Sequence, residues 1–403
     1  MSRRVLLLAG AFAPAFLGTL SAQVRPVTRA EAIAVAMAQG PRVALARSDA
    51  AAAMAAVSRA RQWENPSFAF DYTKDAPRQH YSLGIPLPFP SRGARIDIAN
   101  LGLTSATQRL AYELEAVAYD ADTTYTGALV AAARARLSAR AARDADSLLT
   151  LATLRRDAGD ASDLEVEVVR VSAGQLANAA AADSLDAANA LVSVQALMGL
   201  ATQRATITLA DTLDLPPPAE LPGTGTILLI AAAESEARAA ELGVSVERRW
   251  LFTQPALVVG FETDDPGGYE HQLLPTIGFS FPLPLFNQNG AGKQTAVAAR
   301  DRANASLALA RIELTAMRAR AEREFVVARE RVARSMRLAE SAERVVSLSI
   351  LAYREGATTL PLVLEAQRTS RETLFQVVDD IARVRNTAGL IRLLSLTATP
   401  GPP

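Results

Sequence analysis

The chain has 403 residues, 50% of them hydrophobic, and its 42 basic residues balance its 42 acidic residues at a formal net charge of zero. The charge balance excludes nucleic-acid binding driven by bulk electrostatic attraction, and the apolar content excludes general disorder. The sequence has no cysteine and two histidines. Disulfides, thiolate metal sites, cysteine nucleophiles and a multi-histidine metal centre within one chain are therefore excluded, and we expect no metal and no cofactor.

Residues 1–22 have the pattern of a secretory signal peptide. A short basic start precedes the apolar run Val5–Leu20, and small residues around Ala22 offer a cleavage site. Beyond this segment, no apolar run approaches the ~18–20 residues that a membrane-spanning helix needs. The sequence therefore predicts an exported chain whose mature part has no transmembrane helix.

Two shorter helices are expected ahead of two strand-like segments. Thr28, with Glu31 three residues later, has the pattern of a capping box, and the helix that it opens is expected to run toward Trp63. Its counterpart is expected from about Thr226 toward Trp250.

The strand-like segments, 66–90 and 255–286, alternate apolar residues with small or polar ones, and a polar turn interrupts each of them. Alternation with a period of two over this length predicts β-strands, so each segment is expected to form a β-hairpin. Prolines then mark the exit from the sheet, because proline cannot donate to a strand ladder.

The chain is an internal duplication. Gly93 and Gly159 recur as Gly290 and Gly356, each 197 residues later. An inserted residue would rotate the packing face of a helix by about 100°, so the unchanged spacing indicates rigid helical rods. Apolar residues at steps of three and four predict coiled-coil seams. These seams contain Leu110, Leu114, Val117, Ala121, Thr124 and Ala128 in the first half and Leu307, Ala310, Leu314, Met317 and Ala321 in the second.

We expect two repeats joined by a linker rich in proline and glycine. In each repeat a hairpin leads into a long helix, a glycine turn and a return helix, because glycine suits the turn between antiparallel helices. The first repeat is expected at 23–205, with helices at about 93–158 and 160–201. The linker is expected at 206–225. The second repeat is expected at 226–396, with helices at about 291–355 and 358–396, and a disordered tail at 397–403.

One chain supplies four strands, too few to close a barrel, and open sheet edges in lipid would leave backbone groups unpaired. Several copies must therefore share one barrel, and three copies in cyclic symmetry give 12 strands. The predicted fold class is mainly α with a small antiparallel β part: long antiparallel coiled-coil helices and two β-hairpins, assembling as a trimeric 12-stranded β-barrel continued by an α-helical tunnel. The residues expected to face lipid are Phe68, Phe70, Tyr72, Leu83, Ile85, Val259, Phe261, Phe279 and Phe281.

The unit of hairpin, long helix, glycine turn and return helix, present twice, resembles the TolC-like outer membrane efflux protein family. The opening Thr28–Ala32 through Gly40-Pro41 is similar to the family's first helix. The resemblance covers nearly all of the mature chain and is closest to the branch that includes heavy-metal efflux channels. It implies a homotrimer in the cell outer membrane with a large periplasmic part, working with a periplasmic adaptor and an inner membrane pump. Many relatives in that branch carry a lipid on an N-terminal cysteine, which this sequence does not have.

The resemblance gives a role to the two glycine turns. In the family these turns form the periplasmic tip, which closes the tunnel and receives the adaptor. The alternative is plain helix-turn chemistry, which needs glycine, serine and threonine in any case. The residues expected to face the adaptor are Gly159, Asp160, Ser162, Gly356, Thr358 and Thr359.

Acidic rings that face the lumen follow the tip in the family and select cations or seal the pore. Glu365 stands where one ring carboxylate is expected, and Leu362 stands where a second acid would be. In the first repeat, Asp163 and Glu165 are further candidates for the tunnel gate, with a solvated helix face as the alternative. Three copies of Glu365 near a threefold axis are expected to raise one another's pKa.

No catalytic motif is present, so an enzyme is not expected. Gly292-Lys293 superficially resembles a phosphate loop, but Asn287 stands at the first glycine position and Gln294 replaces the Ser/Thr. For His80 and His271, both near expected hairpin tips, a solvated loop is favoured over a loose cation site. The predicted function is a passive exit channel of a tripartite efflux or secretion system. The alternative is a periplasmic or secreted coiled-coil assembly protein, and the sequence does not name the cargo.

Overall fold

The structure is a computed structural model. It describes residues 25–87, 89–200, 206–216, 226–249, 255–264, 273–281, 283 and 285–397. The expected signal peptide, residues 217–225 of the expected linker, residues 398–403 of the expected tail, Trp250 and His271 lie outside these residues.

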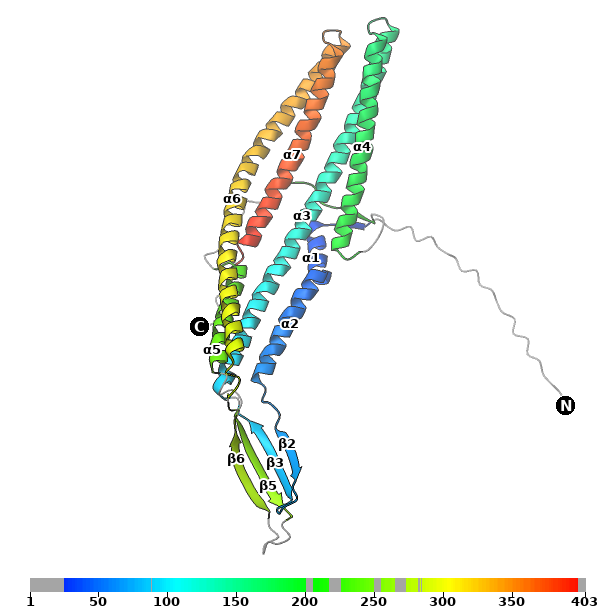
Figure 1. Cartoon of the computed structure of the whole chain (residues 1–403). Helices are drawn as coiled ribbons and strands as arrows, with labels where there is room; N and C mark the ends of the chain where they lie inside the picture. The colour runs from blue at the N-terminus through cyan, green and yellow to red at the C-terminus, as the bar shows by residue number, and fades with distance from the viewer. Residues whose placement is uncertain are drawn as a thin grey trace, which may run out of the picture.

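Four long helices form the body of the molecule (Figure 1). They are α3 (Phe89–Asp157), α4 (Asp163–Leu197), α6 (Gly290–Arg354) and α7 (Leu360–Leu394). The first of these has 69 residues, which corresponds to a rod of about 100 Å at ~1.5 Å per residue. Helix α3 packs on α4, α7 packs on α6, and α3 contacts α7, so the helices lie in the order α4–α3–α7–α6.

The duplication is visible in the helix boundaries. The return helices α4 and α7 both have 35 residues, and their first and last residues are each 197 positions apart. The turns that precede them contain Gly159 and Gly356, both with a positive φ, at 88° and 71°. The spacing read from the sequence thus corresponds to one structural unit repeated in register.

The N-terminal helical region is divided. Where the sequence predicts one helix from Thr28 toward Trp63, the structure has α1 (Arg29–Gln39) and α2 (Pro41–Arg61). Gly40 between them has an extended conformation, with φ −62° and ψ 132°, because the proline ring that follows disfavours the helical region for the preceding residue. The predicted cap at Thr28 is present, since its side chain accepts a hydrogen bond from the backbone N–H of Glu31.

The sheet at the other end of the molecule has four antiparallel strands in the order β2-β3-β5-β6. The strands are β2 (Ser67–Tyr72), β3 (Gln79–Pro86), β5 (Ala256–Thr263) and β6 (Leu274–Ser280). The hairpins of the two repeats join through β3 and β5, and β2 and β6 are left as the edges. A separate two-stranded parallel pair, β1 (Arg25–Val27) and β4 (Ile207–Leu209), lies beside the rods.

Small buried clusters along the rods take the place of a single core. In α6 the predicted seam is buried at Leu314 and Ala321, which pack with Ile391 and Leu394 of α7, whereas Met317 remains 46% exposed. Helix α5 (Leu228–Arg248) packs on α3 and α6 near the sheet. Within the described part of the chain, no helix is long and apolar enough to cross a membrane.

Candidate functional site

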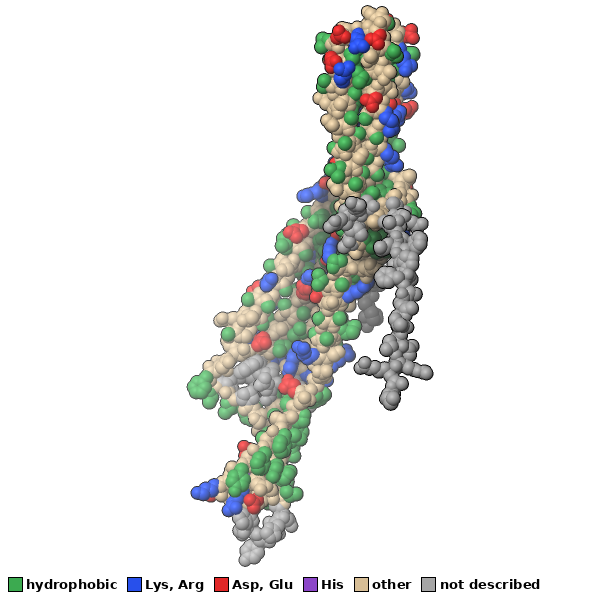
Figure 2. All heavy atoms as spheres, turned by 90° about the vertical axis from the view of Figure 1, so that its right-hand side faces the viewer, with side chains coloured by type: hydrophobic (Ala, Val, Ile, Leu, Met, Phe, Trp, Pro, Cys, Tyr) green, Lys and Arg blue, Asp and Glu red, His purple; other side chains and the backbone are tan. Residues whose placement is uncertain are grey.

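One face of the four-stranded sheet is apolar over three successive rows, and only its last row, with Gln79 and Thr263, is polar. The strand register places Phe68 opposite Leu83 and Leu83 opposite Val259, and the next row joins Phe70, Tyr81 and Phe261. The Tyr81 and Phe261 rings stack with their centroids 4.9 Å apart. Figure 2 shows hydrophobic side chains gathered at this end of the molecule.

These apolar side chains are exposed in the isolated chain. Phe68 is 68% exposed and Phe279 is 71% exposed. Burial of large apolar side chains is the main favourable term in folding, so such a face on an otherwise stable sheet needs an apolar environment outside the chain. Eight of the nine residues predicted to face lipid lie in strands on this one face, and Phe281 directly follows β6.

The opposite face of the sheet carries small and polar residues. Its rows are Ser67, Gly84, Val258 and Gly278, then Ala69, Ser82, Gly260 and Thr276. Charged side chains within the strands occur on this face in one row only, which consists of Asp71, His80, Glu262 and the apolar Leu274. A two-residue period therefore divides the sheet into an apolar face and a polar face.

The two helix turns lie together at the far end of the rods (Figure 1). Backbone N–H groups of Gly159 and Asp160 donate to the carbonyls of Arg156 and Arg155, and Gly356 and Ala357 repeat this pattern 197 residues later. These bonds close the helix ends in the αL geometry that glycine permits. Among the six predicted adaptor-facing residues, Thr358 is half-buried and the others are exposed.

The two turns differ in how the next helix begins. Ser162 caps α4, because its hydroxyl accepts a hydrogen bond from the backbone N–H of Glu165 at 3.2 Å. Thr359 occupies the same position before α7 and makes no side-chain cap. The turn of the first repeat is therefore held by one more hydrogen bond.

A contact between the repeats, not anticipated from the sequence, holds the two turns together. Arg155 of α3 donates from Nη1 to the carbonyl oxygen of Tyr353 in α6, at 2.9 Å, and its guanidinium lies 4.5 Å from the centre of the Tyr353 ring. Leu148, Ala152, Val166 and other apolar residues surround that ring. The sequence carried no signal for this pair, because neither residue stands out from its helix pattern.

The predicted gate residues occupy different environments. Glu365 is exposed and bonded to Arg368 at 2.6 Å, and these hydrogen bonds lower the pKa of the Glu365 carboxyl. This lowering of the pKa is opposite to the rise expected for three clustered carboxylates, and it applies to one copy of the chain by itself. Asp163 is 90% exposed at the tip, and Glu165 is half-buried near Tyr353.

Glu365 and Arg368 also line a cavity of about 780 Å³ between the four long helices. Arg140 and Asp144 of α3 and Glu343 of α6 line it from the other side. The cavity wall thus carries charges of both signs close to the tip.

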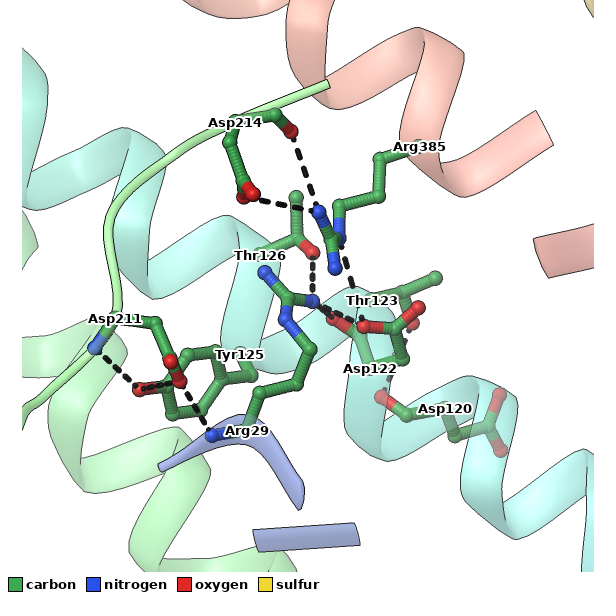
Figure 3. A network of polar contacts seen from close by, with 9 residues as sticks. All are labelled: Arg29, Asp120, Asp122, Thr123, Tyr125, Thr126, Asp211, Asp214 and Arg385. Carbon is green, nitrogen blue, oxygen red and sulfur yellow. Dashed lines mark hydrogen bonds and ion pairs between the residues drawn. The ribbon is translucent and has the colours of Figure 1, made fainter. Parts of the chain in front are cut away.

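A polar network halfway along the rods joins α1, near the start of the chain, and α7, near its end, to the long helix α3 (Figure 3). Asp122 of α3 pairs with Arg29 of α1 and lies 3.9 Å from Arg385 of α7. The Tyr125 hydroxyl bonds to Asp211 at 2.9 Å, and burial raises the pKa of Tyr125 to about 12. The network fixes α1, α3, α7 and the segment after β4 to one another.

No group of three or more histidine, aspartate or glutamate side chains suited to a metal ion occurs among the described residues. The features that stand out are therefore surfaces: an apolar sheet face, two exposed turns and long helix edges. Together they define a class of chain in which an apolar-faced sheet continues into a long helical bundle.

Comparison with known proteins shows where this fold occurs. No family model matches the chain. The nickel-cobalt-cadmium resistance protein NccC of Alcaligenes xylosoxydans xylosoxydans is 27% identical over 295 residues, which cover 70% of this chain and 66% of that protein. The outer membrane protein VceC of Vibrio cholerae matches with a TM-score of 0.75 and 15% identity, over 92% of this chain and 96% of that one.

CusC, whose crystal structures concern folding and transmembrane channel formation, matches with a TM-score of 0.74 and 15% identity over 91% of each chain. The chain therefore has the fold of the TolC-like outer membrane channels, and the resemblance seen in the sequence is confirmed. The matched region spans just under two thirds of NccC.

Proposed function

We propose that the protein is one subunit of a homotrimeric outer membrane channel, the passive exit duct of a tripartite efflux system. The observation that carries the proposal is the four-stranded sheet with one apolar face and two unpaired edges, β2 and β6, in the described chain. A sheet in lipid has to close, because unpaired backbone groups cost several kcal/mol each there. Three copies would supply 12 strands and place the apolar face toward lipid.

The outer helices α4 and α6 support the same assembly. Each has a second row of exposed apolar side chains near the tip, besides the row packed inside the chain. These rows contain Leu164, Val168 and Val171 in α4 and Val345, Leu348 and Leu351 in α6. Steps of three and four are the spacing of a coiled-coil seam.

The two helix edges are also complementary in charge. Helix α4 has five acidic residues and one basic residue, whereas α6 has seven acidic and 13 basic residues. Opposite charge on the two outer edges favours head-to-tail contact between copies and disfavours contact of like edges. A ring of copies would pair α4 of one subunit with α6 of the next and continue the barrel as a helical tunnel.

The remaining roles follow from this arrangement. The exposed turns around Gly159 and Gly356 would meet a periplasmic adaptor, with an inner membrane pump supplying the energy. The negative charge near the periplasmic entrance of the tunnel would come from Glu365, Asp163 and Glu165. The name of the relative NccC suggests divalent metal cations as cargo, and the helical rods would lie in the periplasm.

Cysteine cross-linking tests the assembly cleanly, because the sequence has no cysteine. Val168 is five residues into α4 from the tip and Leu348 is six residues before the end of α6, so head-to-tail contact would bring them to one level. Detergent-extracted protein carrying both V168C and L348C should oxidise to a covalent trimer with three times the mass of the exported single chain.

Mixtures of the two single variants should cross-link, and neither single variant alone should do so. Met54 of α2, 61% exposed, provides the matched control, because M54C with L348C should remain monomeric on denaturing gels. A chain that stays in the soluble fraction and never cross-links would instead support a periplasmic coiled-coil assembly. That alternative leaves the apolar sheet face unexplained.

A further inference from the structure

The row of charged residues on the polar face of the sheet has a defined place. Backbone pairing sets Asp71 opposite His80 and His80 opposite Glu262, one pairing position before the end of β2 and on the side of the sheet away from the helices. Nearer the helices the same face carries serine, threonine, alanine, glycine and valine. Any charge on this face of the strands is therefore concentrated at one end.

The His80 ring is held between two partners. Its Nδ1 lies 3.3 Å from Oε1 of Glu262, and its Nε2 lies 3.1 Å from Oγ1 of Thr73. Both partners can accept a hydrogen bond, so a protonated imidazole ring would donate to each of them. The sequence favoured a solvated loop for His80, whereas the structure has it inside β3.

The other charged groups of this region are few. Two positions farther from the helices, backbone hydrogen bonds of 2.8 and 3.2 Å join Thr73 to Arg78 and Arg78 to Asp264. With a neutral His80, the described charged groups of this region are the acids Asp71, Asp75, Glu262 and Asp264 and the bases Lys74 and Arg78, which give a formal charge of −2 per chain. Protonation of His80 halves it, so three copies around a lumen would go from −6 to −3.

We infer that the Asp71–His80–Glu262 row sets the ion selectivity of the outer mouth of the channel, and that protonation of His80 weakens its preference for cations. The inference rests on the proposed trimeric channel, in which the polar face of the sheet lines the lumen. Fixed charge at the mouth of a pore concentrates counter-ions and so decides which sign of ion passes. Histidine is the side chain whose charge changes most readily between about pH 5 and 8.

Purified trimers in planar lipid bilayers under a KCl gradient provide the test, with the reversal potential measured at pH 8 and at pH 5.5. The permeability ratio of K⁺ to Cl⁻ should fall by about twofold or more on acidification. The His80→Gln channel should keep the K⁺ to Cl⁻ permeability ratio that the wild type has at pH 8. This ratio should then change little on acidification. Glu262→Gln should lower the ratio already at pH 8.

The only other imidazole in the sequence gives the matched control: His271→Gln should leave the pH dependence as it is. A conducting channel whose selectivity ignores pH, or whose pH dependence survives His80→Gln or disappears with His271→Gln, would overturn the inference and leave the channel intact. Failure of the V168C/L348C variant to form a covalent trimer would overturn the proposed function and the inference together.

Discussion

Arg155 and Tyr353 join the two repeats at the tip of the molecule although 198 residues separate them. The guanidinium donates to the Tyr353 carbonyl and lies over its ring, while the rest of that ring is buried at 1% exposure. A cation over an aromatic ring and a hydrogen bond from a charged donor each contribute about 1–2 kcal/mol when partly desolvated. The pair therefore fixes one coiled coil against the other next to the turns.

The Tyr353 hydroxyl is buried and has no hydrogen-bond partner in the described chain. Tyr353→Phe should therefore leave the free energy of unfolding unchanged or raise it by up to ~1 kcal/mol, because an unsatisfied polar atom is removed. Tyr353→Ala should cost about 3–5 kcal/mol by opening a cavity. Thermal unfolding of both variants checks the contrast, and a Phe variant as unstable as the Ala variant would reveal a partner for the hydroxyl.

The turn glycines should resist substitution. Gly159 and Gly356 have φ values of 88° and 71°, which a residue with a Cβ adopts at a cost of roughly 1–2 kcal/mol. Gly159→Ala and Gly356→Ala should each lower stability by that amount. Gly174 lies inside α4, where an added Cβ would meet nothing within 4 Å, so Gly174→Ala should raise stability by about 0.5–1 kcal/mol. Calorimetry of the three variants would show the opposite signs.

Alkaline pH should weaken the mid-rod network through Tyr125. Its pKa is about 12 in the fold against about 10 when unfolded, so the folded state binds the phenol proton more tightly. The stabilisation is fully present below pH ~10 and is lost as the pH rises toward 12. Tyr125→Phe loses bonds to Val27 and Asp211, and should be less stable than the wild type at pH 8. Denaturant titrations should show this gap shrinking between pH 10 and 12.

Glu365 and Glu372 offer a matched pair at the proposed entrance, because both bond to Arg368 and both side chains are 57% exposed. Glu365→Gln should reduce the cation selectivity of the reconstituted channel, since it removes three charges near the tip. Glu372→Gln removes the same charge seven residues farther along α7 and should have the smaller effect. Equal effects of the two variants in bilayer recordings would argue against a ring at Glu365.

Two glycines on the polar face of the sheet should differ sharply. A Cβ at Gly260 would lie 2.3 Å from the carbonyl oxygen of Tyr81, whereas at Gly278 it would meet nothing within 4 Å. Gly260→Ala should therefore separate β3 from β5 and reduce the yield of trimer, because a backbone atom cannot rotate away as a side chain can. Native gels of detergent extracts should show normal trimer for Gly278→Ala.

Much of the fold could be predicted from local patterns. The period of two at Phe68, Phe70 and Tyr72 marks one sheet face, and the interval between Gly159 and Gly356 marks the repeat. The single helix expected from Thr28 was wrong, since Gly40 before a proline leaves the helical conformation. The roles of the turns and of the acidic residues near them stay predictions until adaptor binding and conduction are measured.

Chain order and periodicity by themselves determined the hairpins, the rods and their turns, because these depend on residues a few positions apart. The tertiary structure alone decided which distant side chains meet: Arg155 with Tyr353, Asp122 with Arg29 and Arg385, and His80 with Glu262. A contact between helices depends on how each helix is rotated about its axis, and a contact between strands depends on their register. Any of the 40 arginines in the sequence could have formed such pairs, and only packing of the apolar seams selects among them.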